Sequence, residues 1–264
     1  KVRSHFELLR KYSDYIICYS NFDQTYFLRH ELLDHLPFPK FVPLGHPRND
    51  FLVRNSDNRF FISSEREKFG IPESSKVVLF APTHRESLVL KNDYDKKLLE
   101  SYLVELERLD RKLSNLNVKI LFRPHYYFNE FPKYGFKNIY LVTSDKFPNP
   151  AVLMLISDVL ITDYSSIYVD YLLLQKPMAF YQPDLDYYQE VRGLVVDVNN
   201  PVHMPGPKIN KLSDILDLDE YEFKKYDLKT SRAFFHKYFD DKATERLAKF
   251  LLKIINEEEV VDNV

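Results

Sequence analysis

Short apolar segments that alternate with longer amphipathic ones are the feature of this sequence that most restricts its fold. Residues 95–116 place leucines and a tyrosine at helical spacing with charged residues on the opposite face, which predicts an amphipathic helix. Short segments rich in β-branched or aromatic residues, with prolines or polar residues beside them, are typical of buried strands. Five such segments are residues 15–20, 76–82, 118–124, 158–163 and 177–182.

Strands and helices that alternate along a chain indicate a parallel sheet with helices on both faces. We therefore predict an α/β protein with a doubly wound parallel sheet. Residues 231–257 predict two helical stretches that break near residues 239–241. Residues 38–50 contain three prolines and the first glycine of the chain, so we expect a linker there.

The composition excludes several classes of protein. The 264 residues are enough for one large domain or two smaller ones, each with a sizeable core. Lys and Arg number 37 against 39 Asp and Glu, so the overall charge does not indicate nucleic acid as a partner, and an anion site would need a local cluster. The only cysteine is Cys18, which excludes an intramolecular disulfide and a cysteine-based zinc site.

The ends and the hydropathy of the chain indicate its compartment. No run of about 18 apolar residues occurs, and the first residues lack the apolar core of a signal peptide. We therefore expect a cytoplasmic protein. The chain starts in a charged helical pattern without a methionine, so we also expect it to be a fragment of a longer protein.

Polar residues follow three of the predicted strands directly. Residues 81–85 (APTHR), 123–125 (RPH) and 163–166 (DYSS) each come after an apolar segment. In open α/β sheets, ligands bind outside the carboxyl ends of the strands. These ends together supply arginines, histidines, hydroxyls and a carboxylate, a set that a sheet with a purely structural role does not need.

The DYSS turn admits two interpretations. Asp163 or Ser165 could cap the helix that follows. The unpaired N–H groups and partial positive charge of a helix start also suit a phosphate. The turn has no glycine, so it is neither a Walker loop nor a dinucleotide fingerprint. Both interpretations stay open on this motif alone.

The RPH and APTHR motifs each combine an arginine with a second polar side chain. Arg123 and His125 stand two residues apart beyond a strand end, so both can face one ligand. Arginine offers a fixed fork for phosphate oxygens, and histidine can donate to a leaving group near neutral pH. The alternative is a solvated histidine with the arginine in a surface ion pair. Thr83 and Arg85 could likewise hold a nucleotide or cap their loop.

Two further arginines stand in turns that contain glycine. In residues 44–50, Gly45 and Pro47 predict a sharp turn that positions Arg48, either in an ion pair with Asp50 or toward a ligand. Arg192 stands at a loop end in residues 190–193 (EVRG) and could contact phosphate or remain solvated. No role is assigned to the remaining glycine-containing motif, MPGP at residues 204–207.

Taken in order, these motifs resemble the CDP-glycerol glycerophosphotransferase family, the polymerases of teichoic acids and related glycerol-phosphate capsules. The resemblance extends from about Tyr15 to Leu247, and its most specific part is residues 157–188. It implies a GT-B architecture of two Rossmann-like domains. Residues 1–47 would then be the tail of an incomplete N-terminal domain plus the interdomain linker, and residues 48–264 the CDP-glycerol-binding domain with its C-terminal helices.

The resemblance also implies an activity and a site. The family transfers glycerol phosphate from CDP-glycerol to the end of a poly(glycerol phosphate) chain and releases CMP. His125 would be the catalytic residue that stabilises or protonates the leaving phosphate. The residues implied or considered for donor binding are Arg48, Pro82, Thr83, Arg85, Arg123, Ser165, Ser166, Asp170 and Arg192. No carboxylate cluster has the spacing expected for Mg²⁺, so we assign no metal and no cofactor.

Two departures from the family pattern affect this expectation. The family carries a His-Gly-Thr element in its first domain, assigned to the acceptor, and the present sequence has no such element. The family often has tryptophan after APT, where this chain has His84. Donor binding therefore remains the expectation, and turnover by this chain alone is in question.

The sequence does not show which pocket residues determine the identity of the donor, so three alternatives remain. They are a CDP-ribitol transferase, a GT-B transferase of nucleotide sugars, and a non-catalytic nucleotide-binding module. The acceptor would be a polyol phosphate or a lipid-linked polymer. A lipid-linked acceptor would imply peripheral contact with the inner face of the cell membrane.

Overall fold

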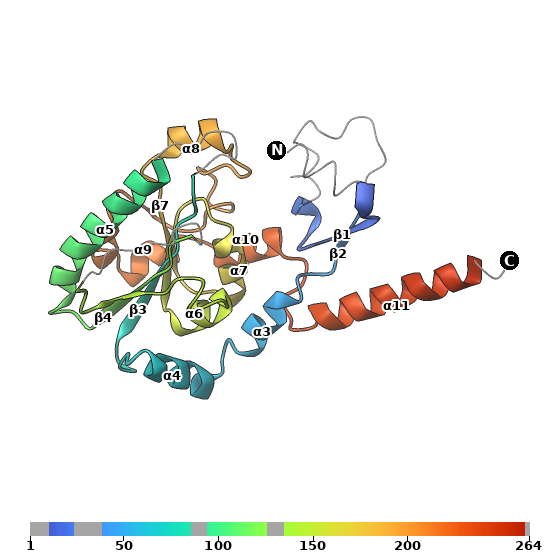
Figure 1. Ribbon diagram of the computed structural model, residues 1–264, viewed down its shortest axis with the longest axis horizontal. Coiled ribbons are helices and arrows are strands. Elements are labelled where there is room, and N and C mark those ends of the chain that lie inside the picture. Colours follow the sequence, from blue (N-terminus) through green and yellow to red (C-terminus); the bar gives the residue numbers. More distant parts are fainter. Residues whose placement is uncertain (1–10, 24–38, 86–93, 126–134, 262–264) are drawn as a thin grey trace. The chain divides into compact units, whose positions relative to one another are not determined.

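The computed structural model describes residues 11–23, 39–85, 94–125 and 135–261, with side chains described as far as residue 256 (Figure 1). The chain divides into two compact units. The first contains Lys1–Asp57 and Ala233–Val264, and the second contains Asn58–Arg232. This division differs from the predicted boundary at residue 47, because the last helix of the chain contacts a helix near residue 50 and so belongs to the first unit.

The second unit is built on a six-stranded sheet in which all paired strands are parallel, in the order β5-β4-β3-β6-β7-β8. From β3 the chain moves outward to β4 and β5, then returns to β6 on the other side of β3. This reversal makes the sheet doubly wound, as predicted. The strands are β3 (Lys76–Phe80), β4 (Val118–Phe122), β5 (Ile139–Leu141), β6 (Val159–Thr162), β7 (Met178–Tyr181) and β8 (Lys208–Ile209).

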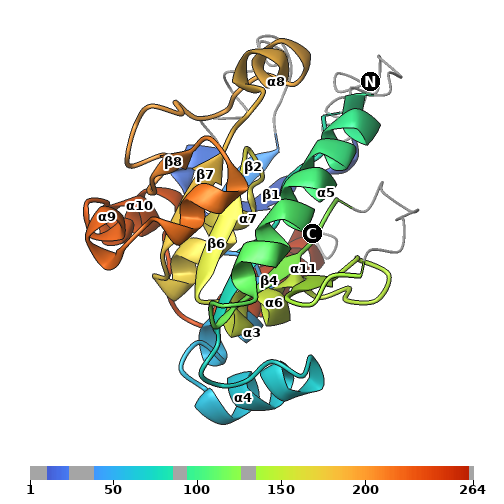
Figure 2. The same ribbon diagram turned by 90° about the vertical axis from the view of Figure 1, so that its left-hand side faces the viewer.

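Helices cover both faces of this sheet. Figure 1 shows α5 (Tyr94–Leu113) on one side of the strands and α6 (Pro150–Ile156) and α7 (Ile167–Tyr171) on the other, and Figure 2 shows α5 in front of the sheet. The other described helices of this unit are α4 (Arg59–Lys68), η1 (Leu172–Leu174), α8 (Leu185–Val191), η2 (Leu212–Leu216), α9 (Glu220–Lys224) and α10 (Leu228–Phe235), whose last residues pass into the first unit.

The amphipathic pattern predicted α5 correctly. Its inward residues are buried and form one core cluster with alternate residues of β3, β4 and β6. Burial of each large aliphatic side chain contributes about 1.5–3 kcal/mol, so this helix face is a major part of the core. The inward residues are Leu98, Leu99, Tyr102, Leu103, Leu106, Leu109 and Leu113.

The first unit shows that the predicted linker was wrong. Residues 40–43 form β2 (Lys40–Pro43), which pairs in parallel with β1 (Tyr15–Cys18), and α3 (Arg48–Arg54) follows at once. The prolines stand at the end of β2 and just before α3, where they are compatible with regular structure. The carboxylate of Asp50 accepts the N–H groups of Ala243 and Thr244, both at 2.8 Å, and so caps the start of α11 (Ala243–Val261).

The end of the chain agrees with the prediction of two helices with a break between them. The helices α10 and α11 are separated by residues 236–242. None of the helices in the described ranges is long and apolar enough to cross a bilayer.

Candidate functional site

The loops after β3, β4, β6 and β7 meet at the carboxyl edge of the sheet, because these four strands are neighbours and run in the same direction. The prediction that the first three loops converge is therefore confirmed. The fourth loop, after β7, adds Gln182 and Asp184. Neither was predicted as a site residue: Gln182 is the last residue of the predicted strand segment 177–182, and Asp184 lies just beyond it.

Asp163 is the residue that connects the β3 and β6 loops. Its carboxylate is fully buried and accepts the backbone N–H of Thr83 at 2.9 Å, of Tyr164 at 2.7 Å and of Ser165 at 3.1 Å, and it also forms an ion pair with Arg85. The N-cap position of α7 is Ser166, whose side chain makes no capping hydrogen bond. Asp163 therefore organises the turn itself and does not cap the helix.

Arg85 was considered as a donor-binding residue, but its side chain lies inside the protein. Its side chain is 0% exposed, and all five N–H donors of the guanidinium have acceptors within the protein. Nε and Nη2 donate to the two oxygens of Asp184 at 2.8 and 2.9 Å. Nη1 donates to Asp163 and to the carbonyl of Thr83, and Nη2 also reaches the hydroxyl of Tyr102 at 3.4 Å.

The charges around Arg85 are balanced. Burial acts to lower the pKa of its guanidinium, but the carboxylates of Asp163 and Asp184 outweigh burial and raise that pKa. Two stacked tyrosine rings, Tyr164 and Tyr188, lie against the guanidinium, with its central carbon 4.9 and 5.3 Å from the ring centroids. We call Arg85, Asp163 and Asp184 the Arg85 clamp. It ties three strand-end loops together from inside.

A pair of histidines stands at the same edge. The rings of His84 and His125 lie with their centroids 4.0 Å apart and their planes at 31°. The pKa of both imidazoles is lowered to about 4, mainly by burial, with smaller contributions from Arg192 at both rings and from His84 at His125. Asp95 opposes this effect at His125. Both imidazoles are therefore neutral at pH 7.

Three residues that lie far apart in the sequence, His84, His125 and Arg192, come together at this edge. The sequence predicted His125 and Arg192 as site residues, and the electrostatic effect of Arg192 on both imidazoles places it near them. His84 was counted among the polar residues at the strand ends and noted as a departure from the family pattern, but it was not predicted as a site residue. Its position between Thr83 and Arg85, in a motif already selected, was the signal that could have identified it.

Arg123 follows β4 and donates to backbone carbonyls. Its Nη1 donates to the carbonyls of Phe147 at 2.7 Å and Val142 at 3.4 Å. Among the residues that the structure describes, no carboxylate forms an ion pair with Arg123. Burial lowers the pKa of its guanidinium. The surface ion pair considered from the sequence is thus not found in the described part of the chain.

The remaining predicted residues are distributed over both units. Ser165 is half-buried and Ser166 is exposed at the start of α7, while Asp170 is buried within that helix. Pro82 is buried and Thr83 half-buried in the β3 loop.

Arg48 belongs to the first unit, where it begins α3 and donates from Nη2 to the hydroxyl of Tyr19. The predicted pairing with Asp50 is replaced by the cap that Asp50 provides to α11. Within the described residues, no group of three or more histidine, cysteine or acidic side chains is arranged to hold a metal ion.

Comparison with known proteins identifies the family. The family described as CDP-glycerol:poly(glycerophosphate) glycerophosphotransferase matches residues 3–253 of this chain. The chain belongs to this glycerophosphotransferase family. The resemblance expected from the motifs is thereby confirmed.

Curated members of the glycerophosphotransferase family align with most of the chain. The teichoic acid poly(glycerol phosphate) polymerase of Bacillus spizizenii is 33% identical over 186 residues, which are 67% of this chain and 43% of the relative. The teichoic acid poly(ribitol-phosphate) polymerase of the same organism is 31% identical over 231 residues, which are 84% of this chain and 35% of the relative. The chain therefore spans less than half the length of these two relatives.

A solved structure of the same family supports the fold. The wall teichoic acid polymerase TagF matches 97% of this chain and 61% of its own, with a TM-score of 0.73 and 26% sequence identity. TagF is a GT-B glycosyltransferase. The predicted fold class, a Rossmann-like half of a GT-B fold, is therefore confirmed.

Proposed function

We propose that this chain supplies the donor-binding part of an enzyme that transfers glycerol phosphate from CDP-glycerol to a growing polymer end in teichoic acid biosynthesis. One observation carries the proposal. In a chain of the glycerophosphotransferase family, the neutral imidazole of His125 stands beside Arg192 at the edge of the sheet where Arg123 also lies, with no ion pair among the described residues. Arginines next to a histidine suit a pyrophosphate and its leaving group.

The reaction is an in-line displacement at phosphorus. An acceptor hydroxyl attacks the β-phosphorus of CDP-glycerol, the bond from that phosphorus to the CMP oxygen breaks, and the electron pair of that bond leaves with CMP. The hydroxyl proton passes to a base on the acceptor side. Negative charge spreads over the phosphate oxygens, so fixed positive groups supply much of the rate enhancement.

His125 would act on the leaving CMP phosphate. In the free protein its imidazole is neutral because burial and Arg192 disfavour the protonated form. A bound pyrophosphate brings negative charge next to the ring and raises its pKa. The imidazole could then take up a proton and donate it to the leaving oxygen, so donor binding would itself prepare the acid. His84, stacked on His125, would fix the orientation of the ring.

The other predicted residues have three proposed roles: contact with the donor, support through backbone or packing, and positioning of the loops. Arg123, Arg192, Ser165, Ser166 and Thr83 have exposed or half-buried side chains and would contact the donor. The residues that would contribute through their backbone or through packing are Pro82 and Asp170. Arg85 would be a positioning residue, because its five donors are occupied inside the protein. Arg48 of the first unit remains a proposed donor contact.

A specific observation favours a second candidate donor, CDP-ribitol. The ribitol-phosphate polymerase of Bacillus spizizenii aligns with 84% of this chain, against 67% for the glycerol-phosphate polymerase, at nearly equal identity. The two donors share the CDP group and differ in the polyol. The residues described above face the shared pyrophosphate and do not choose between them.

Calorimetric titration with CDP-glycerol, CDP-ribitol and a UDP-sugar tests the proposal. We expect CDP-glycerol to bind at least about tenfold more tightly than the UDP-sugar, because a site shaped for one base and polyol leaves polar groups unpaired with another. His125→Asn should retain donor binding and serves as the matched control for folding. Tighter binding of the UDP-sugar would replace the proposal with a sugar transferase, and binding without any transfer by the full-length protein would favour a non-catalytic module.

We propose a cytoplasmic location, with an acceptor that is a polyol-phosphate chain or its lipid-linked form. The nucleotide donor is a cytoplasmic metabolite class, which supports this assignment. A lipid-linked acceptor would bring the protein to the inner face of the cell membrane. Sedimentation of the protein with vesicles that contain a lipid-linked polymer, against vesicles without it, would test this contact.

A further inference from the structure

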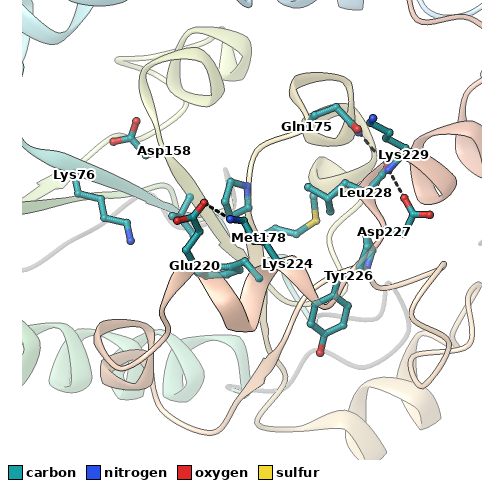
Figure 3. A pocket seen from close by; sticks show the side chains of 14 residues that line it. Lys76, Asp158, Gln175, Met178, Glu220, Lys224, Tyr226, Asp227, Leu228 and Lys229 are labelled. Atoms are coloured by element: carbon teal, nitrogen blue, oxygen red, sulfur yellow. Dashed lines mark hydrogen bonds and ion pairs between the residues drawn. The ribbon is translucent and has the colours of Figure 1, made fainter.

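A cavity at the amino edge of the sheet has no part in the proposed function. It has a volume of about 640 Å³ and lies where β3, β6 and β7 begin, with α9 and the start of α10 forming its other wall (Figure 3). Lys76, the first residue of β3, lines it, whereas His84 follows the last residue of that strand. The cavity and the histidine pair are thus at opposite ends of the same strands. Its volume is in the range of small-molecule sites.

One side of this cavity is apolar. Val159 and Met178 begin two strands of the sheet, and Phe223 and Leu228 come from α9 and α10. The two strand residues are buried, whereas Phe223 and Leu228 are half-buried and present apolar surface to a ligand body.

The MPGP motif shapes one wall of the cavity. Pro205 lines it, and a Cβ atom placed on the next residue, Gly206, would lie only 2.1 Å from the backbone oxygen of Met178. Only glycine allows the chain to pass so close to the start of β7. The motif that had no role in the sequence thus closes the cavity against the sheet.

The acidic residues at the rim already have partners. Asp158 forms an ion pair with Arg66 at 2.8 Å and accepts the N–H of Val77 at 2.7 Å. Glu220 forms an ion pair with Lys224 at 2.8 Å, drawn as a dashed line in Figure 3. Their negative charges are therefore compensated within the protein.

The third acid, Asp227, is occupied by the start of α10. Its carboxylate accepts the backbone N–H groups of Lys229 and Thr230, both at 3.1 Å, and the Thr230 hydroxyl at 2.6 Å. These hydrogen bonds lower its pKa and fix it as a helix cap. The carboxylate therefore stays ionised, with the charge of Lys229 nearby.

Two exposed lysines, Lys76 and Lys229, also line the rim. Within the described residues, neither Lys76 nor Lys229 forms an ion pair. Figure 3 shows them on either side of Met178. With Arg66, the partner of Asp158, four positive side chains stand against three acids at this cavity, so its net charge is positive.

We propose that this cavity binds an amphipathic anion, with its apolar body against Phe223 and Leu228 and its carboxylate, sulfonate or phosphate group at the rim beside Lys76 or Lys229. The apolar side selects the body, and the net positive charge selects the sign of the charge. The site is separate from the donor site and does not depend on the identity of the donor.

Fluorescence titration with anilinonaphthalene sulfonate, an aromatic anion that brightens in apolar sites, tests the proposal on the whole chain. We expect saturable binding that decanoate displaces and decyltrimethylammonium does not. The double variant Lys76→Gln with Lys229→Gln should bind the probe about tenfold more weakly, because the net positive charge at the rim is lost. Both lysines are exposed, so the variant should keep the melting temperature of the parent.

A control variant tests whether the loss of probe binding is specific to the cavity lysines. Lys112→Gln removes an exposed lysine of α5, away from the cavity, and should leave probe affinity unchanged. Unchanged affinity in the double variant, or equal displacement by the cationic and anionic detergents, would overturn the proposal. CDP-glycerol affinity should be the same in parent and double variant, so failure here leaves the donor site unaffected, and failure of the donor site leaves this result standing.

Discussion

Replacement of Asp163 by asparagine is the sharpest test of how the carboxyl edge is built. The carboxylate is fully buried, and it accepts three backbone N–H groups and the Nη1 of Arg85. Asparagine is nearly isosteric but neutral, and its NH₂ group would face donors that need an acceptor. Loss of one partner from a buried ion pair costs about 3–5 kcal/mol, because the other charge stays buried without compensation.

Asp184 retains its two hydrogen bonds to Arg85, so we expect the lower end of that range, a loss of about 3 kcal/mol in the free energy of unfolding. Urea unfolding followed by circular dichroism measures this loss. Asp241→Asn is the matched control, because Asp241 pairs with Arg54 across side chains that are 37% and 64% exposed. Its loss of stability should be much smaller, because exposed ion pairs contribute little.

The same variant should weaken CDP-glycerol binding, because the loops that carry Thr83 and Ser165 lose their common anchor. Calorimetry on protein that is still folded at low urea separates this effect from unfolding. A loss of stability for Asp163→Asn no larger than that for Asp241→Asn would refute the reasoning, since it would mean that the clamp contributes no more than an exposed pair.

Three further results are expected. His125→Ala should abolish polymer formation by the full-length protein with little change in melting temperature, and retained turnover would rule out its role on the leaving group. Ser165→Ala combined with Ser166→Ala should weaken CDP-glycerol binding about tenfold in calorimetry, whereas equal affinity would count against a phosphate contact there. The free energy of unfolding should fall as the pH drops from about 6.5 to about 4, because His84 and His125 take up protons more readily in the unfolded chain. His84→Asn with His125→Asn should flatten this part of the pH profile, and an unaltered slope would contradict the low pKa values.

The central strands and the major helix of the second unit were predictable from hydropathy alone. Strand β3, for example, needs only a run of buried β-branched and aromatic residues. The edge strands β5 and β8 contain three and two residues, too few to produce a pattern. Strand β2 was missed because its flanking prolines indicated a linker, and pairing with a distant strand overrode that local signal.

The site was predictable at the level of loops and not at the level of each side chain. The rule that ligands bind at the carboxyl ends of parallel strands selected the correct loops. The burial of Arg85 depends on acids that lie 78 and 99 residues away in the sequence, so no local pattern could reveal it. For the same reason, the stacking of His84 on His125 required the pairing of β3 with β4.

These long sequence separations determine when, during folding, the protein becomes able to bind the donor. The Arg85 clamp joins loops that are brought together only after β3, β6 and β7 have assembled, and closing such long loops is slow compared with helix formation. During refolding, the recovery of CDP-glycerol binding should therefore lag behind the recovery of helical circular dichroism. A nascent chain that ends before Asp184 would already have most of its sheet but would leave the positive charge of Arg85 half compensated. The ability to bind the donor would thus also indicate that β3, β6 and β7 have assembled.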